Sequence, residues 1–316
     1  MSRTPGPAVP DPRLSIVITV VEGAAALRRC LARLRPQAEA LGAEIIVPYD
    51  AWCADVQALV DEFPDVRWQP VDDLGAAAAV RSRRDHRLFD RRRAAGLAVA
   101  RGQLVAMTED RSVPAADWCA QLVAAHAQPA AAIGGAIDNA VDRPMNWALY
   151  YCDFGRYGRP LQPGPAAYVS DVNVAYRRAA LESIRPVWSA AYHETTVHWA
   201  LQARGETILL DPRPVILQDR PPIGLAAAYR ERIAFARGFA ATRAAACSGW
   251  HRALYALGTP LLPFVLALRV AHHMRRQRRT GAQLAHVLPL AFLLLTGWAL
   301  GELIGYVAPL RPRTSL

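Results

Sequence analysis

LSIVITVV, residues 14–21, is an unbroken run of apolar and β-branched side chains. Such runs are typical of strands that are buried on both faces of a parallel sheet. A stretch with helical leucine spacing (26–41) follows, and three further strand-like runs come after it: EIIVPYD (44–50), VRWQPV (66–71) and QLVAMT (103–108). Helical patterns separate these runs: DVQALVDEF (55–63) follows the second run, and AAGLAVARG (94–102), a helix expected to end at Gly102, precedes the fourth. The alternation predicts an α/β domain with a mainly parallel sheet and helices on both faces.

The composition excludes a disordered chain. Of the 316 residues, 53% are hydrophobic and 20% are charged, enough for one large domain or two modest ones. The net charge is +10 and the sequence has no lysine, so arginine carries the positive charge. A basic excess favours nucleic acid, anionic lipid or phosphate-bearing partners. The arginines gather around 81–93 and near the apolar C-terminus, outside any nucleic-acid module, so we expect no nucleic-acid partner.

The cysteines and the N-terminus point to a reducing compartment. The chain has five widely spaced cysteines and no CxxC pair, which indicates neither a disulfide framework nor a zinc site. Residues 1–12 are proline-rich and lack the apolar core of a signal peptide, so we expect a flexible tail there. The bulk of the chain is expected to stay in the cytosol.

Acidic residues stand where two of the expected strands end. Asp50 closes EIIVPYD, and Glu109 and Asp110 follow QLVAMT directly. Ligands of open α/β sheets bind beyond the carboxyl ends of the strands, so these acids share a functional edge. Glu109 and Asp110 either hold a metal that carries a phosphate or are solvated loop acids. Arg111 follows them and is able to neutralise the pair.

The second half of the chain has a different pattern. The residues up to 222 continue the first half, so we expect a single domain over 13–222. The next segment, 223–252, mixes arginine with large apolar residues, as an interfacial helix does. In the last part, 253–316, two apolar runs (254–271 and 284–310) flank a basic hinge. We expect membrane-associated helices there, with buried core helices as the alternative.

The membrane topology contains a conflict. If both apolar runs cross as a hairpin, the four arginines of the hinge lie opposite the catalytic domain, against the positive-inside tendency. The first run is short and is interrupted by Pro260 and Pro263. A hairpin is the first interpretation. The second is that the first run lies in the interface and that only the second run crosses.

Five segments together resemble family 2 glycosyltransferases, which have the Rossmann-like GT-A fold, over roughly residues 13–240. They are LSIVITVVEG (14–23), EIIVPYDAW (44–52), RRRAAGLAVARGQLVAMTED (91–110), SDVNVAYRRAAL (170–181) and YHETTVHWALQARG (192–205). Four features depart from the family pattern. Tyr49 replaces the first Asp of the second strand, and Ala94 replaces an Asn. Thr108-Glu109-Asp110 replaces the metal-binding DxD, and His193 occupies the position of a Glu.

The resemblance implies a role for each matching residue. Asp110, assisted by Glu109, would hold Mn or Mg, Glu194 would be the catalytic base, and His193 is its rival. Donor binding would fall to Glu22, Asp50, Arg93, Glu109 and Asp110, and acceptor binding to Asp171 and Asn173.

Physical chemistry supports these roles. Sugar transfer from a nucleotide-sugar donor releases the nucleoside diphosphate as the leaving group. Its departure needs positive charge at the leaving oxygens, which a divalent cation on carboxylates supplies. An inverting transfer needs one base for the acceptor hydroxyl. Glu194 is such a carboxylate, although a helix-capping carboxylate would look the same.

The expected protein is therefore an inverting glycosyltransferase at the cell membrane, with its catalytic domain on the cytoplasmic side. Its donor would be a nucleotide sugar, a UDP-sugar in first place, and its acceptor lipid-linked or part of the cell envelope. The sequence has no QxxRW motif, which favours single addition over polymer synthesis. The alternative is a degenerate homologue that binds nucleotide or lipid as a scaffold.

Overall fold

A computed structural model describes residues 11–71 and 86–308. Most of the expected tail (1–12) and part of the arginine-rich segment (81–85) therefore lie outside the described residues. The chain divides into two compact units. The sheet unit comprises Met1–Ile137 and Leu161–Gln218, and the helical unit comprises Asp138–Pro160 and Asp219–Leu316.

One half of the sheet is parallel, with β1 at its centre. β1 pairs with β2 on one side and with β4 on the other, and β2 pairs with β3. All six residues of β1 are buried, as the opening apolar run predicts. The strands are β1 (Leu14–Thr19), β2 (Glu44–Tyr49), β3 (Arg67–Pro70) and β4 (Leu104–Glu109).

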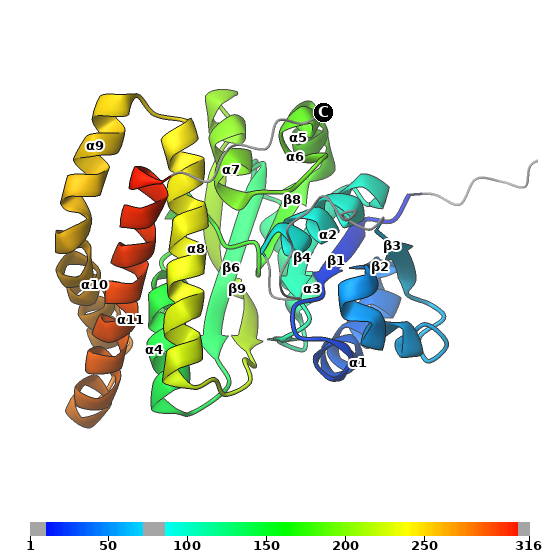
Figure 1. The fold of residues 1–316 in the computed structure, drawn as a ribbon. Helices are drawn as coiled ribbons and strands as arrows, with labels where there is room; N and C mark the ends of the chain where they lie inside the picture. Colours follow the sequence, from blue (N-terminus) through cyan, green and yellow to red (C-terminus); the bar gives the residue numbers. More distant parts are fainter. Residues whose placement is uncertain (1–10, 72–85, 309–316) are drawn as a thin grey trace, which may run out of the picture. The chain divides into compact units, whose positions relative to one another are not determined.

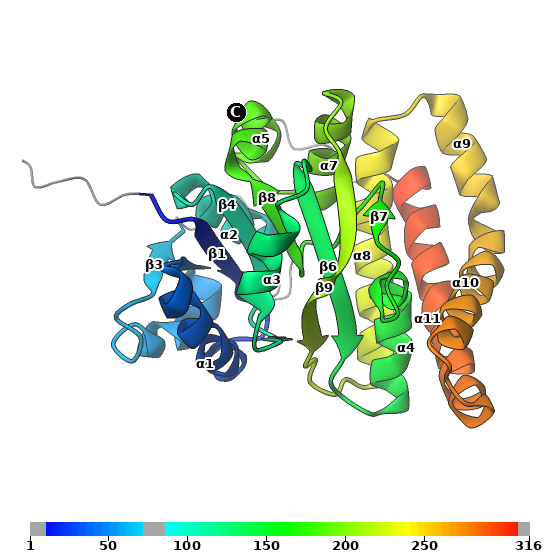
Figure 2. The ribbon, with the colours of Figure 1, turned by 180° about the vertical axis from the view of Figure 1, so that it is seen from behind.

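Helices cover both faces of this half, which confirms the predicted fold class (Figures 1 and 2). α1 (Ala24–Leu41) packs with α3 (Trp118–Ala125), and α2 (His86–Val99) packs on β1 and β2. α2 lies so close to the sheet that a Cβ at Gly96 would be 2.4 Å from the Val17 Cγ1 atom. Glycine is needed there for space.

Two helices differ from the sequence-based expectation. The stretch DVQALVDEF was expected to be a helix, and a 3-10 helix, η1, occupies Ala51–Leu59 instead, with Asp50 as its N-cap. The helix expected to end at Gly102 ends at Val99. Gly102 does not cap it, because its N–H donates to the Ser15 Oγ at 2.7 Å and its Cα packs on the β1 backbone.

The second half of the sheet is antiparallel. β8 pairs with β4 and β6, and β9 pairs with β5 and β7, which joins the loosely patterned part of the chain to the same sheet. These strands are β5 (Ser112–Pro114), β6 (Ala132–Asn139), β7 (Gly164–Pro165), β8 (Val174–Arg177) and β9 (Ile208–Gln218). The helices are α5 (Arg178–Ser183), α6 (Arg185–Trp188) and α7 (Glu194–Ala203).

The helical unit is built around a long helix, α11 (Gly281–Val307), which packs against α8, α10 and α4 (Figure 1). Two of its helical segments, Gly249–Arg276 and Gly281–Val307, are long and apolar enough to cross a membrane, a property shared by core helices of soluble proteins. The other elements are α4 (Pro144–Asp153), η2 (Gly155–Tyr157), α8 (Leu225–Ala245), α9 (Gly249–Gly258), η3 (Thr259–Leu261) and α10 (Leu262–Arg276).

Candidate functional site

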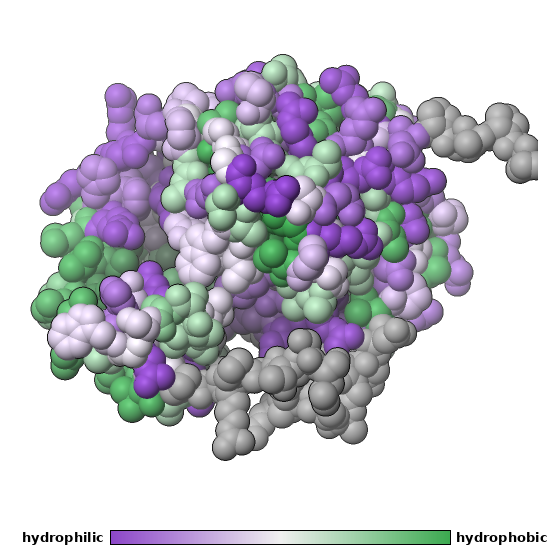
Figure 3. Space-filling model, turned by 90° about the horizontal axis from the view of Figure 1, so that it is seen from above, coloured by the Kyte–Doolittle hydropathy of each residue, from purple (hydrophilic) through white to green (hydrophobic). Residues whose placement is uncertain are grey.

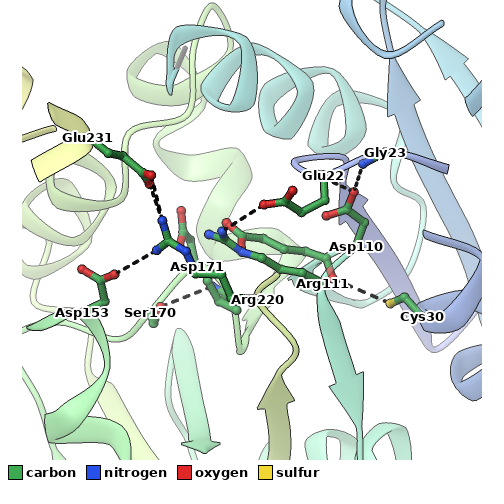
Figure 4. A network of polar contacts seen from close by, with 12 residues as sticks. Glu22, Gly23, Cys30, Asp110, Arg111, Asp153, Ser170, Asp171, Arg220 and Glu231 are labelled. Carbon is green, nitrogen blue, oxygen red and sulfur yellow. Dashed lines mark hydrogen bonds and ion pairs between the residues drawn. The ribbon is translucent and has the colours of Figure 1, made fainter. Parts of the chain in front are cut away.

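Two loops meet at the carboxyl edge of the parallel half. Thr19, the last residue of β1, pairs in register with Glu109, the last residue of β4. The residues after each strand are therefore neighbours: Glu22 follows β1, and Asp110 and Arg111 follow β4 (Figure 4). This is the edge where open α/β sheets bind their ligands.

Glu109 lies between two guanidinium groups. Its Oε1 accepts a hydrogen bond from Arg93 Nη2 at 3.0 Å, and its Oε2 accepts one from Arg111 Nε at 2.9 Å. Burial by itself raises the pKa of this carboxyl, but the charges of Arg111 and Arg93 outweigh burial and hold the pKa below its ordinary value. Glu109 is therefore an anion with both oxygens engaged.

Arg93 connects Glu109 to the antiparallel half of the sheet unit. Its Nη2 also lies 3.0 Å from the Asp171 Oδ2, and its Nη1 lies 3.4 Å from Asp90. The Arg93 side chain is buried, with 4% of its surface exposed. Burial raises the pKa of Asp171, the nearby Glu109 adds to this effect, and Arg93 opposes it.

Glu194 joins the same group of side chains from the start of α7. Its Oε2 accepts a hydrogen bond from the Asp171 backbone N–H at 3.0 Å. His193, the N-cap residue of α7, is partly buried. Burial and the positive charge of Arg93 lower the pKa of His193, so its imidazole is neutral at pH 7.

Arg111 brings Glu22 into the group, with its Nη1 3.8 Å from the Glu22 Oε1. The Arg111 side chain is 14% exposed and that of Glu22 is 11% exposed, so this end of the group reaches the surface. We call the following set the edge cluster: Glu22, Arg93, Glu109, Arg111, Asp171, His193 and Glu194.

Asp110 has different partners from Glu109. Its Oδ2 accepts hydrogen bonds from the backbone N–H groups of Glu22 and Gly23, both at 2.9 Å (Figure 4). It is 1% exposed. Burial raises the pKa of Asp110 to about 6; the two N–H groups oppose that rise and the Glu109 charge adds to it. Asp110 therefore anchors the turn after β1.

The expected metal ligands do not fit a two-carboxylate site. Both Glu109 oxygens accept hydrogen bonds from arginine, and the Asp110 Oδ2 is engaged by two N–H groups. Only the Asp110 Oδ1 lacks a hydrogen-bond partner. Among residues 11–71 and 86–308, no group of three or more His, Cys, Asp or Glu side chains is placed to hold a metal ion.

Asp50 lies outside the edge cluster, in a buried ion pair. Arg92 Nε donates to the Asp50 Oδ2 at 2.9 Å, and Arg92 Nη2 donates to the Asp50 Oδ1 at 2.7 Å. The Trp52 N–H donates to the Asp50 Oδ1 as well, and the Arg92 Nη1 donates to the Val20 carbonyl. A nucleobase that binds Asp50 would share these acceptor oxygens with Arg92.

Asn173 is also separate from the edge cluster. Its Oδ1 accepts a hydrogen bond from Trp118 Nε1 at 2.8 Å, and its Nδ2 donates to the carbonyls of Ala136 and Pro214. It is fully buried. The structure thus engages the Asn173 amide inside the fold, and an acceptor contact by this residue stays a prediction.

Arg92 and Arg111 have partners that the sequence patterns did not predict: Arg92 pairs with Asp50, and Arg111 contacts Glu22 as well as Glu109. The run RRR at 91–93 does contain the signal, because consecutive residues of a helix point about 100° apart and therefore meet different partners. Arg92 points to Asp50, whereas Arg93 points to Glu109 and Asp171.

Comparisons with known proteins identify the family of the chain. The model of the family described as Glycosyl transferase family 2 matches residues 15–185, which include every residue of the edge cluster except His193 and Glu194. No curated protein matches the chain. Solved structures that match include the mannosyltransferase PcManGT from Pyrobaculum calidifontis in complex with GDP-Man and Mn2+. That protein is 17% identical, with 99% of this chain and 80% of that chain covered and a TM-score of 0.44, a likeness too distant to transfer its properties.

Proposed function

The chain belongs to glycosyl transferase family 2 and is a glycosyltransferase, and we propose that it transfers one sugar, with inversion, from a nucleotide sugar to a lipid-linked or membrane-proximal acceptor. A UDP-sugar is the donor that we favour. The reaction would take place in the sheet unit, at the carboxyl ends of β1 and β4. The proposed location is the cell membrane, with this unit on the cytoplasmic side.

The observation that carries the proposal is that the edge cluster brings the Glu194 carboxylate together with the guanidinium groups of Arg93 and Arg111. Glu194 contacts Asp171, and Asp171 pairs with Arg93, which in turn pairs with Glu109 beside Arg111. We assign Glu194 as the base that removes the proton of the acceptor hydroxyl during attack. The neutral imidazole of His193 is the second candidate for this role.

Arg111 is the group to which we assign the leaving diphosphate. It is the more exposed of the two arginines, and a guanidinium binds phosphate oxygens through two parallel N–H groups. Arg93 is buried among carboxylates, which fits a positioning role for Asp171 and Glu109. Charge stabilisation of the leaving group is therefore assigned to a side chain of this protein, and a divalent cation is given no part.

A second candidate function is a scaffold that binds nucleotide or lipid without turnover. The observation that favours it is that Asp50 and Glu109, two of the expected donor-binding acids, have both carboxylate oxygens bound by arginine. In a scaffold these pairs would serve stability alone. Donor turnover distinguishes the two functions.

The test is donor consumption in detergent with UDP-, GDP- and dTDP-sugars and a membrane lipid extract as acceptor. We expect one donor to be consumed, and Glu194→Gln to lower kcat by about 10²–10⁴-fold while the affinity for the donor is retained. The matched control is Glu182→Gln, which removes an exposed carboxylate of α5 and should leave turnover unchanged. Donor binding without turnover would support the scaffold, and no binding of any nucleotide would contradict the enzyme and leave only a scaffold that binds lipid.

A further inference from the structure

One face of α9, η3 and α10 is apolar and exposed. Its members recur every three or four residues, so they share one side of the helices. We call this set the apolar stripe: Trp250, Leu254, Leu257, Leu261, Phe264, Val265 and Leu268. The exposed fractions run from 51% for Val265 to 79% for Leu257. In the space-filling view from above, apolar residues gather at the left edge, on the side where α9 lies in Figure 1 (Figure 3).

The opposite side of these helices already has a partner. Tyr255 stacks on Tyr306 of α11, with ring centroids 5.7 Å apart. Val270 and Met274 of α10 are buried, and α10 packs along α11. The apolar stripe is therefore additional to the face that α10 uses for packing inside the helical unit.

α11 packs against three other helices, although Leu293, Leu300 and Leu303 on its remaining side are exposed. Its glycines 297, 301 and 305 lie one turn apart and face α8: a Cβ at Gly301 would be 2.4 Å from the Ile233 carbonyl oxygen, and one at Gly305 would be 2.6 Å from the Ala240 Cβ. Small residues at this spacing let two helix backbones approach closely. α4 and α10 pack against other parts of α11.

The helix beside α11 is strongly charged. α8 carries four arginines and a glutamate: Arg230, Glu231, Arg232, Arg237 and Arg243. Arg232 is buried and donates to Asp153 of α4 at 3.0 Å, and Arg220 also pairs with Asp153 (Figure 4). If α11 crossed a bilayer, α8 would enter the hydrocarbon with it, and charged side chains are costly there.

The surroundings of the apolar stripe are basic. Residues 249–280 contain six arginines and neither Asp nor Glu. Five of the six are exposed: Arg252, Arg269, Arg275, Arg276 and Arg278. Exposed apolar residues flanked by arginine, without acids, are typical of helices that lie in the interface of anionic membranes.

We propose that the protein is monotopic: the apolar stripe inserts into one leaflet of an anionic bilayer, and neither α10 nor α11 crosses it. The whole chain then stays on one side of the membrane, and the arginines at 275–279 lie on the side of the catalytic domain. This removes the conflict with the positive-inside tendency that a hairpin creates. The proposal does not depend on the donor or the acceptor.

The first test measures binding of the full-length protein to vesicles of phosphatidylcholine with and without phosphatidylglycerol, by flotation. We expect at least tenfold tighter binding with the anionic lipid, and at least tenfold weaker binding for the double variant Leu257→Asp/Leu268→Asp. The control is Val187→Asp, an exposed apolar residue of the sheet unit, which should bind as the unaltered protein does. Because these side chains are exposed, thermal unfolding of all three proteins should be similar.

The second test distinguishes insertion from crossing. Arg33→Cys in α1, Arg278→Cys between α10 and α11, and Val307→Cys at the end of α11 are exposed positions for a membrane-impermeant maleimide in sealed vesicles. We expect all three to be labelled from the same side, above the background of the native cysteines. Labelling of Arg278→Cys or Val307→Cys from the side opposite to Arg33→Cys would overturn the proposal. Unchanged flotation of the double variant would do so as well.

Discussion

The Arg92 guanidinium and the Asp50 carboxylate form two hydrogen bonds, of 2.9 and 2.7 Å, between helix α2 and the end of β2. The two side chains are 1% and 6% exposed. This buried ion pair holds α2 against the end of β2. Breaking the pair is costly, because the remaining charge would stay inside the protein without a partner.

Asp50→Ala should therefore destabilise the fold by about 3–5 kcal/mol, the usual cost of one partner missing from a buried pair. Urea unfolding at pH 7 measures this. The control is Glu62→Ala, which breaks the exposed pair with Arg28 and should cost much less. In the double variant Asp50→Ala/Arg92→Ala the loss should be smaller than the sum of the single losses. Additive losses would show that the two residues act independently.

Asp110 should make stability depend on pH between about 4 and 6. Its pKa is raised to about 6 in the folded protein, so the folded state is favoured while the carboxyl is protonated and loses that advantage as the pH rises through 6. Asp110→Asn has no such titration. The variant should gain up to about 3 kcal/mol relative to the unaltered protein between pH 4 and pH 7. Urea unfolding of both proteins across this range gives the difference, and a constant difference would contradict the raised pKa.

His193 should have the opposite pH dependence. Burial and Arg93 lower its pKa, so the folded state resists protonation and loses stability as the pH falls below the ordinary histidine value of 6.5. His193→Gln removes this loss. The free energy of unfolding of the variant should therefore fall less than that of the unaltered protein from pH 7 to pH 5. Equal decreases would mean that His193 is readily protonated in the folded state.

The effect of a chelator on turnover should distinguish a leaving group stabilised by Arg111 from one stabilised by a divalent cation. If Arg111 supplies the positive charge at the leaving diphosphate, EDTA should leave donor turnover unchanged and Arg111→Ala should lower kcat/KM by about 10²-fold. Arg213→Ala, which removes an exposed arginine of β9, is the control. Turnover that is lost in EDTA and restored by Mn²⁺ would mean that the carboxylates rearrange around a cation.

Gly301 should tolerate no larger side chain. A Cβ there would lie 2.4 Å from the Ile233 carbonyl oxygen of α8, a contact that only a shift of the helices relieves. Gly301→Ala should destabilise the protein by about 1–3 kcal/mol, the range for overpacking. Gly258→Ala, at a helical glycine with no atom within 4 Å of its Cβ position, should be neutral or stabilising. Thermal unfolding compares the two variants, and equal shifts would contradict the close packing of α8 and α11.

Much of the sheet, and the edge at which Glu109 and Asp110 lie, could be predicted from local patterns. A strand buried on both faces needs an apolar residue at nearly every position, so β1, β2 and β4 are visible as runs of sequence. Parallel strands bring their carboxyl ends to one edge, so the sequence predicts that Glu109 and Asp110 lie at that edge. The partners of these acids could not be predicted, since adjacent side chains meet different surroundings: Glu109 meets two arginines and Asp110 meets backbone N–H groups.

The family, the α/β sheet and the apolar character of the C-terminal helices follow from the sequence alone, because each of these depends on residue types at short spacing. The three-dimensional fold is needed to show that Arg92 pairs with Asp50 while Arg93 pairs with Glu109 and Asp171. It also shows that α11 packs against α8, α4 and α10, and that the apolar stripe of α9 and α10 is exposed. Hydropathy is the same for a helix in lipid and a helix packed in protein, and long-range contacts alone separate the two.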